Sequence, residues 1–113
     1  MTTRQAQIAA MNDQFRAHGP SRSVPGQMFT TAGIAALPLA LQAAIVAKVQ
    51  TFETFTEDND PHGEHDFGAF DVAGAGRIFW KIDYYADRDM EAGAEDPAAQ
   101  CFRVLTIMLA CEY

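Results

Sequence analysis

Two runs of aromatic and β-branched residues, 67–73 and 77–85, are separated only by Gly74-Ala75-Gly76. This spacing predicts a β-hairpin, because a short connection that contains glycine can reverse the chain between two strands. With Ala73 facing Arg77, the apolar residues on one face are Phe70 opposite Trp80, Val72 opposite Ile78, and Ile82. A one-residue slip would mix these residues with the polar ones of the other face, so the pattern fixes which face is buried.

The opposite face of the expected hairpin collects polar side chains. In the same register His65, Lys81, Asp83 and Tyr85 share that face. If the face is covered, such a set can carry out general acid–base catalysis. The alternative is that Lys81 and Asp83 form a surface ion pair, which contributes little to stability.

Two segments show the apolar periodicity of helices. The residues at helical spacing are Ile8, Met11 and Phe15 in segment 4–18, and Leu37, Leu41, Ile45 and Val49 in segment 31–49. Gly19-Pro20 ends the first helix, and Pro38 is tolerated in the first turn of the second.

Three more segments are rich in β-forming residues and predict strands at 27–31, 52–56 and 102–113. The last of them is apolar on both faces, which is typical of a central strand that is covered on both sides. The fold class expected is therefore α+β, with two helices packed on a four- to five-stranded, mainly antiparallel sheet.

The segment Asp58–Asp66 is the most polar part of the chain and contains two of its three histidines. Its possible metal ligands are Asp60, His62, Glu64, His65 and Asp66. Imidazole and carboxylate groups bind Zn²⁺ or Mn²⁺, and a bound metal ion would activate water. The alternative is a structural turn, in which Asp and Asn side chains bond to the backbone and Pro and Gly set its angles.

The chain has 113 residues and a net charge of −7. This length predicts a single domain over residues 1–113. Its eight Lys and Arg residues are scattered and form no basic footprint for phosphates, so direct nucleic-acid binding is disfavoured. The acidity suits a basic protein partner, or serves only to keep the domain soluble.

The two cysteines are expected to stay reduced. Cys101 and Cys111 lie about 33 Å apart along one extended strand, whereas a disulfide needs Cα atoms within about 7 Å. Segment 1–5 has no apolar run and predicts no signal peptide, and the apolar segment 31–47 is too short for a membrane span. These features predict a cytoplasmic protein without membrane association.

Several longer motifs resemble an uncharacterised bacterial domain family. They are FTEDNDPHGEHDFG at 55–68, IFWKIDYY at 78–85, RVLTIMLA at 103–110, and Met11-Asn12-Asp13 with Phe15-Arg16. The resemblance covers nearly the whole chain but implies no established activity. Members of that family look like plasmid and mobile-element cargo, which implies an accessory role such as counter-defence of the anti-CRISPR type.

Two functions of different classes follow. The first is a small acidic protein that binds and inhibits or regulates a protein partner, with no cofactor. The second is a metal-dependent hydrolase centred on Asp58–Asp66, with Zn²⁺ or Mn²⁺ and with His65, Lys81, Asp83 and Tyr85 as catalytic groups. The sequence favours the binding protein and leaves self-association open.

Overall fold

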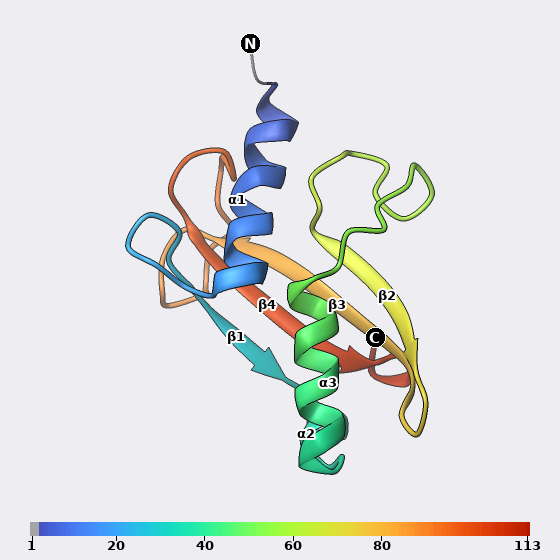
Figure 1. The fold of residues 1–113 in the computed structure, drawn as a ribbon. Coiled ribbons are helices and arrows are strands. Elements are labelled where there is room, and N and C mark those ends of the chain that lie inside the picture. Colours follow the sequence, from blue (N-terminus) through green and yellow to red (C-terminus); the bar gives the residue numbers. More distant parts are fainter. Residues whose placement is uncertain (1–2) are drawn as a thin grey trace.

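The computed structural model describes residues 3–113 and confirms the α+β class, with a four-stranded sheet in the order β1-β4-β3-β2 (Figure 1). Its elements are α1 (Arg4–His18), β1 (Gly26–Thr30), α2 (Ala32–Ala35), α3 (Leu39–Gln50), β2 (Phe67–Val72), β3 (Gly76–Tyr85), β4 (Phe102–Leu109) and a 3₁₀ helix, η1 (Ala110–Glu112). β1 runs parallel to β4 and the other pairs are antiparallel, so the sheet is mixed but mostly antiparallel. The prediction of no signal peptide rests on segment 1–5, of which residues 1–2 lie outside the described residues.

The first helix has the bounds expected from the sequence. The hydroxyl of Thr3 accepts a hydrogen bond from the Ala6 N–H at 3.1 Å and so caps its first turn. Gly19 ends the helix with φ of 80°, and its N–H donates to the Phe15 carbonyl. The second expected helix forms as α3, with Pro38 at its N-cap instead of in its first turn. The segment that leads into it contains a separate single turn, α2, which was not predicted.

The β2–β3 hairpin forms with a different register from the one expected. Val72 pairs with Gly76, and Phe70 pairs with Ile78 instead of Trp80. The connection is a turn closed by the Ala75 N–H on the Val72 carbonyl, and Gly76 follows it with φ of 85°. Because partners shift by two residues, each side chain keeps its face and the predicted apolar face is confirmed.

Two strand predictions need correction. Segment 52–56 forms no strand but a loop, since its backbone groups bond to side chains: the Phe52 carbonyl accepts from Arg16 and the Thr56 N–H donates to Asn59. The last strand ends at Leu109, and the chain then turns into η1. β4 is nevertheless central, between β1 and β3, as predicted.

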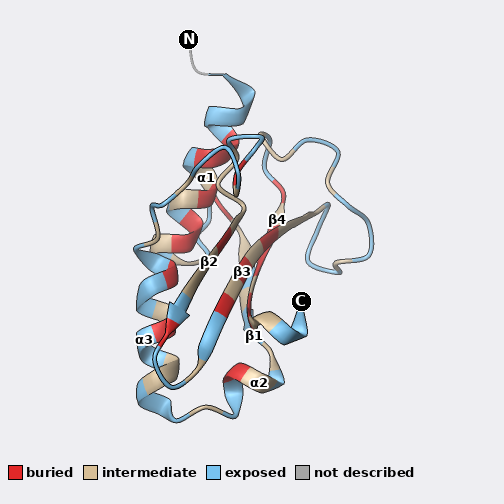
Figure 2. Ribbon diagram, turned by 90° about the vertical axis from the view of Figure 1, so that its right-hand side faces the viewer, coloured by how far each residue is buried: buried red, intermediate tan, exposed pale blue. Residues whose placement is uncertain are grey.

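Within residues 3–113, the two long helices, α1 and α3, lie on the same face of the sheet (Figure 2). Figure 1 shows α1 and α3 lying across it, and Figure 2 shows both helices on the same side of the strands. The core beneath them contains Trp80, Phe15, Ile8, Ile34, Ile45, Ile78, Leu105, Ile107 and Val49, all fully buried. The other face, which we call the open face, carries alternate residues of each strand, among them Val104 and Met108 of β4. These two side chains are buried by neighbouring side chains, and η1 and Tyr113 lie on the same face.

Both cysteines are free, as expected, with Cys101 buried and Cys111 exposed in η1. Burial raises the pKa of the Cys101 thiol. Within residues 3–113, no helix combines the length and apolar character needed to cross a membrane.

Candidate functional site

The loop before β2 is held together by its own polar side chains. Both oxygens of the Asp60 carboxylate face the backbone, where Oδ1 accepts from the Glu64 N–H at 3.0 Å and from the His65 N–H at 3.2 Å. Asn59 accepts from the Thr56 N–H at 2.8 Å and donates to the Thr54 carbonyl at 2.9 Å. Gly63 and His65 both adopt positive φ, of 67° and 58°. This bonding is that of the structural turn considered above.

Helix α1 fixes this loop against the body of the protein. The His65 ring places Nδ1 2.9 Å from a carboxylate oxygen of Asp13 and stacks on Phe55, with ring centroids 3.9 Å apart. The Asn12 amide donates to the Glu64 carbonyl at 2.9 Å. Asn12 and Asp13 of the Met11-Asn12-Asp13 motif therefore dock the loop, while Met11 contacts Arg103 of β4.

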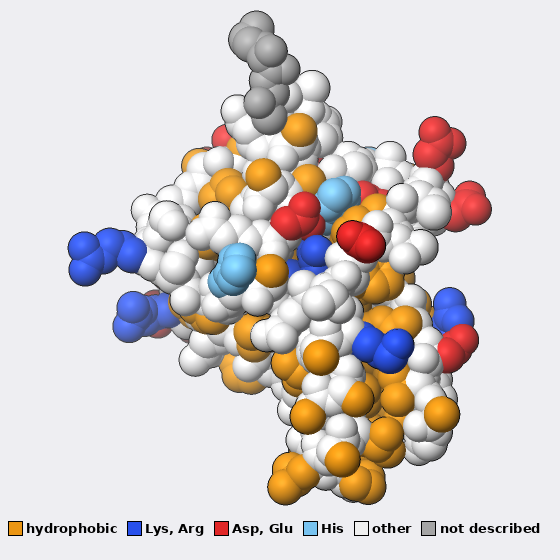
Figure 3. Space-filling model, viewed as in Figure 1, with side chains coloured by type: hydrophobic (Ala, Val, Ile, Leu, Met, Phe, Trp, Pro, Cys, Tyr) orange, Lys and Arg blue, Asp and Glu red, His pale blue; other side chains and the backbone are white. Residues whose placement is uncertain are grey.

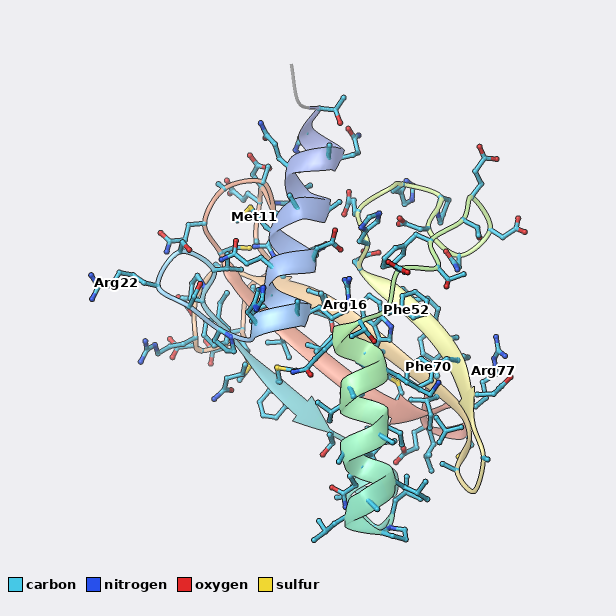
Figure 4. All side chains as sticks on the ribbon, viewed as in Figure 1. Met11, Arg16, Arg22, Phe52, Phe70 and Arg77 are labelled. Carbon is cyan, nitrogen blue, oxygen red and sulfur yellow. The ribbon has the colours of Figure 1, made fainter. Side chains whose placement is uncertain are left out.

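Arg16 lies buried at the centre of this contact. Its guanidinium donates to Asp13 at 3.0 Å and to the Phe52 carbonyl at 2.9 Å, and it lies over the rings of Phe55 and Trp80 at 5.3 and 5.1 Å. Figure 4 shows Arg16 and Phe52 side by side where α1 meets the end of α3. Among the described residues, Arg16 Nε and Trp80 Nε1 are the buried side-chain atoms without a hydrogen-bond partner.

A second buried arginine ties α1 to β4. Arg103 is fully buried, and its guanidinium donates to Asn12 Oδ1 at 2.7 Å, to the Pro97 carbonyl at 2.7 Å and to Cys101 Sγ at 3.2 Å. The Asn12 amide also donates to the Tyr84 hydroxyl at 2.7 Å. Burial raises the pKa of the Tyr84 hydroxyl and so keeps it neutral. This network is a rigid structural core.

The five expected metal ligands are not gathered around one point. Asp60 bonds to the backbone, and His62 is exposed. The His65 ring bonds to Asp13 through Nδ1 and places Nε2 3.7 Å from Asp60 Oδ2. The Glu64 carboxylate lies 3.5 Å from the Tyr84 hydroxyl instead. Within residues 3–113, no three His, Cys, Asp or Glu side chains are grouped closely enough to hold a metal ion.

Asp66 carries a carboxyl group whose pKa is raised by its surroundings. Burial, and next the negative charge of Glu64, raise the pKa of its carboxyl above the ordinary value of 3.8. The folded protein thus favours the protonated form, and the stability that this form provides is lost as the pH rises through the folded pKa.

We therefore expect an Asp66→Asn variant to melt at a higher temperature than the unmodified protein at pH 7, since the amide carries no charge to bury. The difference should shrink as the pH falls through the folded pKa and below the ordinary value of 3.8, because the aspartate is then protonated and neutral like the amide. Thermal unfolding followed by circular dichroism across this pH range is the measurement. Asp71→Asn is the control, because Asp71 is an exposed strand residue in a surface ion pair with Arg77. A variant that melts lower at pH 7 would contradict the reasoning.

The open face carries a groove of about 550 Å³. Its lining residues are Thr31, Lys81, Asp83, Tyr85, Val104, Thr106, Met108, Glu112 and Tyr113. Beside it Tyr113 packs edge-on against Phe67 and Phe79, with ring centroids 5.9 and 5.3 Å apart. The result is an aromatic rim above an apolar floor.

Glu112 fixes one wall of this groove. Its carboxylate accepts hydrogen bonds from the Thr31 hydroxyl, the Leu109 N–H and the Gly33 N–H. The Thr31 bond is the main reason why the pKa of Glu112 is lowered. These bonds join η1 to the start of α2 and hold both beside β4.

The structure brings three of the four expected catalytic residues together and separates the fourth. Lys81, Asp83 and Tyr85 line the groove, and Lys81 Nζ lies 3.0 Å from Asp83 Oδ2 with both side chains partly exposed. His65 does not share their face, because it precedes β2 and its positive φ turns the ring to α1 on the helix side of the sheet. The expectation that all four lie on one face is therefore wrong.

Sequence reasoning missed the buried polar residues Asn12, Arg16 and Arg103. Arg103 gave a signal, since it is the only charged residue in the otherwise apolar run 102–111. Asn12 and Arg16 were visible only as parts of the motif in the first helix. The open groove could not be foreseen, because the apolar pattern of 102–113 predicted a covered face.

Taken together, the fold and the groove define a small α+β domain that leaves one face of its sheet uncovered. The chain belongs to a family described as "Protein of unknown function (DUF3768)", whose sequence profile matches residues 30–112. Helix α1 and nearly all of β1 precede the matched range. Comparisons with curated proteins and with solved structures gave no significant match.

Proposed function

We propose that this protein is a binding module that inhibits or regulates a protein partner through the open face of its sheet. The observation that carries the proposal is the groove over Val104 and Met108, with its rim of Tyr113 and Phe79. Aromatic and methionine side chains are enriched in protein interfaces, and tyrosine is one of the residue types that supply most of the binding energy. We extend the proposal to the role implied by the resemblance to mobile-element proteins, which is action on a host defence protein.

The exposure of the rim supports binding. Tyr113 is 74% exposed and Phe29 of β1 is 42% exposed, so two of the large hydrophobic side chains that face solvent belong to this face. Tyr113 lines the groove, and Phe29 pairs with Thr106 of its lining, so both lie at the same site, and exposed apolar side chains at one site mark interaction surfaces.

The charges of the surroundings define the kind of partner. Within the groove Lys81 is outnumbered by Asp83 and Glu112, and the adjacent segment 86–100 has five acidic residues and one arginine. A partner segment with apolar side chains and Lys or Arg would be complementary to this surface.

The test begins with capture of partners on the immobilised protein from a bacterial lysate. Each captured protein is then purified and titrated calorimetrically against the unmodified chain and two variants. Tyr113→Ala is expected to weaken binding at least tenfold, because it removes an exposed aromatic anchor from the rim. Leu39→Ala is the control, since Leu39 is a similarly exposed apolar residue on α3.

Salt gives a second readout of the same proposal. Affinity should fall as the salt concentration rises, because the contact joins opposite charges. Equal affinities for the unmodified protein and Tyr113→Ala, or a loss only with Leu39→Ala, would exclude the open face as the binding surface.

A further inference from the structure

Strand β1 forms an edge of the sheet with unused hydrogen-bonding groups. The Arg103 N–H donates to the Pro25 carbonyl and the Thr31 N–H donates to the Ile107 carbonyl, both at 3.1 Å. In a parallel pair these bonds direct the backbone groups of odd-numbered β1 residues to β4. The N–H and C=O groups of Gly26, Met28 and Thr30 therefore point outward, and no bond joins them to another segment within residues 3–113.

This edge lacks the devices that normally protect sheet edges. Charged residues, prolines and bulges prevent edge pairing in natural proteins. β1 has the sequence GQMFT, with no charge and no proline, and none of its five residues is buried. The opposite edge strand, β2, carries Asp71 in an ion pair with Arg77.

The chain segment that contains β1 is also free of charge, although Arg88 lies beside Gly26 and Gln27 at one end of the strand and the Glu112 carboxylate lies beside Thr31 at the other. Residues 23–47, which include β1, α2 and most of α3, contain no Asp, Glu, Lys or Arg. In Figure 3 hydrophobic side chains gather on the lower part of the molecule, where α2 and α3 lie. In a chain of net charge −7, this is the region where two copies can meet with the least repulsion.

We propose that two copies of the chain associate by antiparallel pairing of their β1 strands about a two-fold axis at Met28. In this register Met28 pairs with its counterpart, and Gly26 of each copy pairs with Thr30 of the other. All three outward positions are then bonded in both copies, because each hydrogen-bonded antiparallel pair exchanges two bonds. The strand edge is thus complementary to itself, which a two-fold interface requires.

The same arrangement covers exposed apolar surface. On the open face Gln27 of one copy lies opposite Phe29 of the other, as a pair without mutual backbone bonds. Phe29, which is 42% exposed in the single chain, gains a neighbour across the axis. The two sheets become continuous, and their open faces lie side by side.

A cysteine cross-link tests this register. In a Cys111→Ser background, Gln27→Cys and Phe29→Cys are made as separate variants, purified, mixed and oxidised mildly. The mixture is expected to give a covalent dimer, since opposed Cα atoms about 4.5 Å apart allow a disulfide. Each variant alone should not, because identical positions are displaced by two residues, or about 7 Å along the strand. Cross-linking of either variant alone, or none in the mixture, overturns the proposal.

Sedimentation velocity from micromolar to millimolar concentration tests the association itself, without any partner. The unmodified protein is expected to dimerise, and Thr30→Pro to weaken this about tenfold, because it removes an outward N–H from each copy. Its thermal stability as a monomer should stay unchanged, whereas Phe29→Pro should lower stability by removing an N–H that faces β4. A chain that stays monomeric at millimolar concentration overturns the proposal, as does a dimer unaffected by Thr30→Pro.

Discussion

An Arg103→Ala variant is expected to lose about 3–5 kcal/mol of unfolding free energy, because each polar group left without its partner costs about 1–3 kcal/mol and the cavity adds to this. The substitution leaves Asn12 Oδ1 and the Pro97 carbonyl without their donor, and it opens a cavity between α1 and β4. Chemical denaturation followed by circular dichroism measures the loss. Arg77→Ala is the matched control on another strand, and it should change stability by less than about 1 kcal/mol because Arg77 is exposed.

Two further variants separate hydrogen bonding from volume. Arg103→Met keeps much of the side-chain volume but leaves Asn12 Oδ1 without its donor. Asn12→Leu leaves Arg103 Nε without its acceptor. Each single variant leaves a buried polar group without its partner, while the double variant removes that particular bond from both ends. The double variant should therefore lose less stability than the sum of the two single losses. Strict additivity would show that the Asn12–Arg103 bond does not couple the two elements.

The parts of the fold that local chemistry determines were predictable. Helix α1 has its expected bounds because its cap, its apolar spacing and Gly19 are all signals within the segment itself. The buried face of the β2–β3 hairpin was predictable because side chains alternate strictly along a strand. The pairing register of the hairpin was not predictable, since it depends on which turn positions Gly74 and Gly76 occupy. Both glycines adopt positive φ in the structure, so the sequence does not distinguish the alternatives.

The parts that depend on distant residues were not predictable. Segment 52–56 has the composition of a strand, but its Phe52 carbonyl bonds Arg16 of α1 and its aromatic rings pack on Trp80. These contacts replace the pairing that a strand would need. No pattern within segment 52–56 predicts these contacts.

The candidate site shows the same division. Lys81, Asp83 and Tyr85 alternate along one strand, so their common face followed from the sequence alone. The position of His65 depended on its positive φ and on Asp13, which lies 52 residues away in the chain. In the structure His65 bonds to Asp13 of α1, and Asp60 bonds to N–H groups within the loop, so both side chains help to hold the loop in place.

The second large effect is expected at Gly68, where β2 passes closest to the core. A Cβ atom at this position would lie 2.4 Å from Trp80 Nε1 and 2.8 Å from Phe52 Cε1. Trp80 is fully buried between the sheet and the loop, so its ring has little room to move. Gly68→Ala is expected to cost about 2–3 kcal/mol, in the range for overpacked cores.

The cause is crowding and not backbone strain, since Gly68 is not among the glycines with positive φ. Gly93→Ala is the control, because its nearest contact would lie at 3.9 Å, and it should leave stability nearly unchanged. The single tryptophan of the chain reports the effect directly, through the emission of Trp80 together with thermal unfolding. Phe52→Leu in the Gly68→Ala background should restore part of the loss, because the smaller side chain makes room beside the indole. If Phe52→Leu instead lowers the stability of Gly68→Ala further, by as much as it does in the unmodified protein, then crowding does not explain why a glycine is needed at position 68.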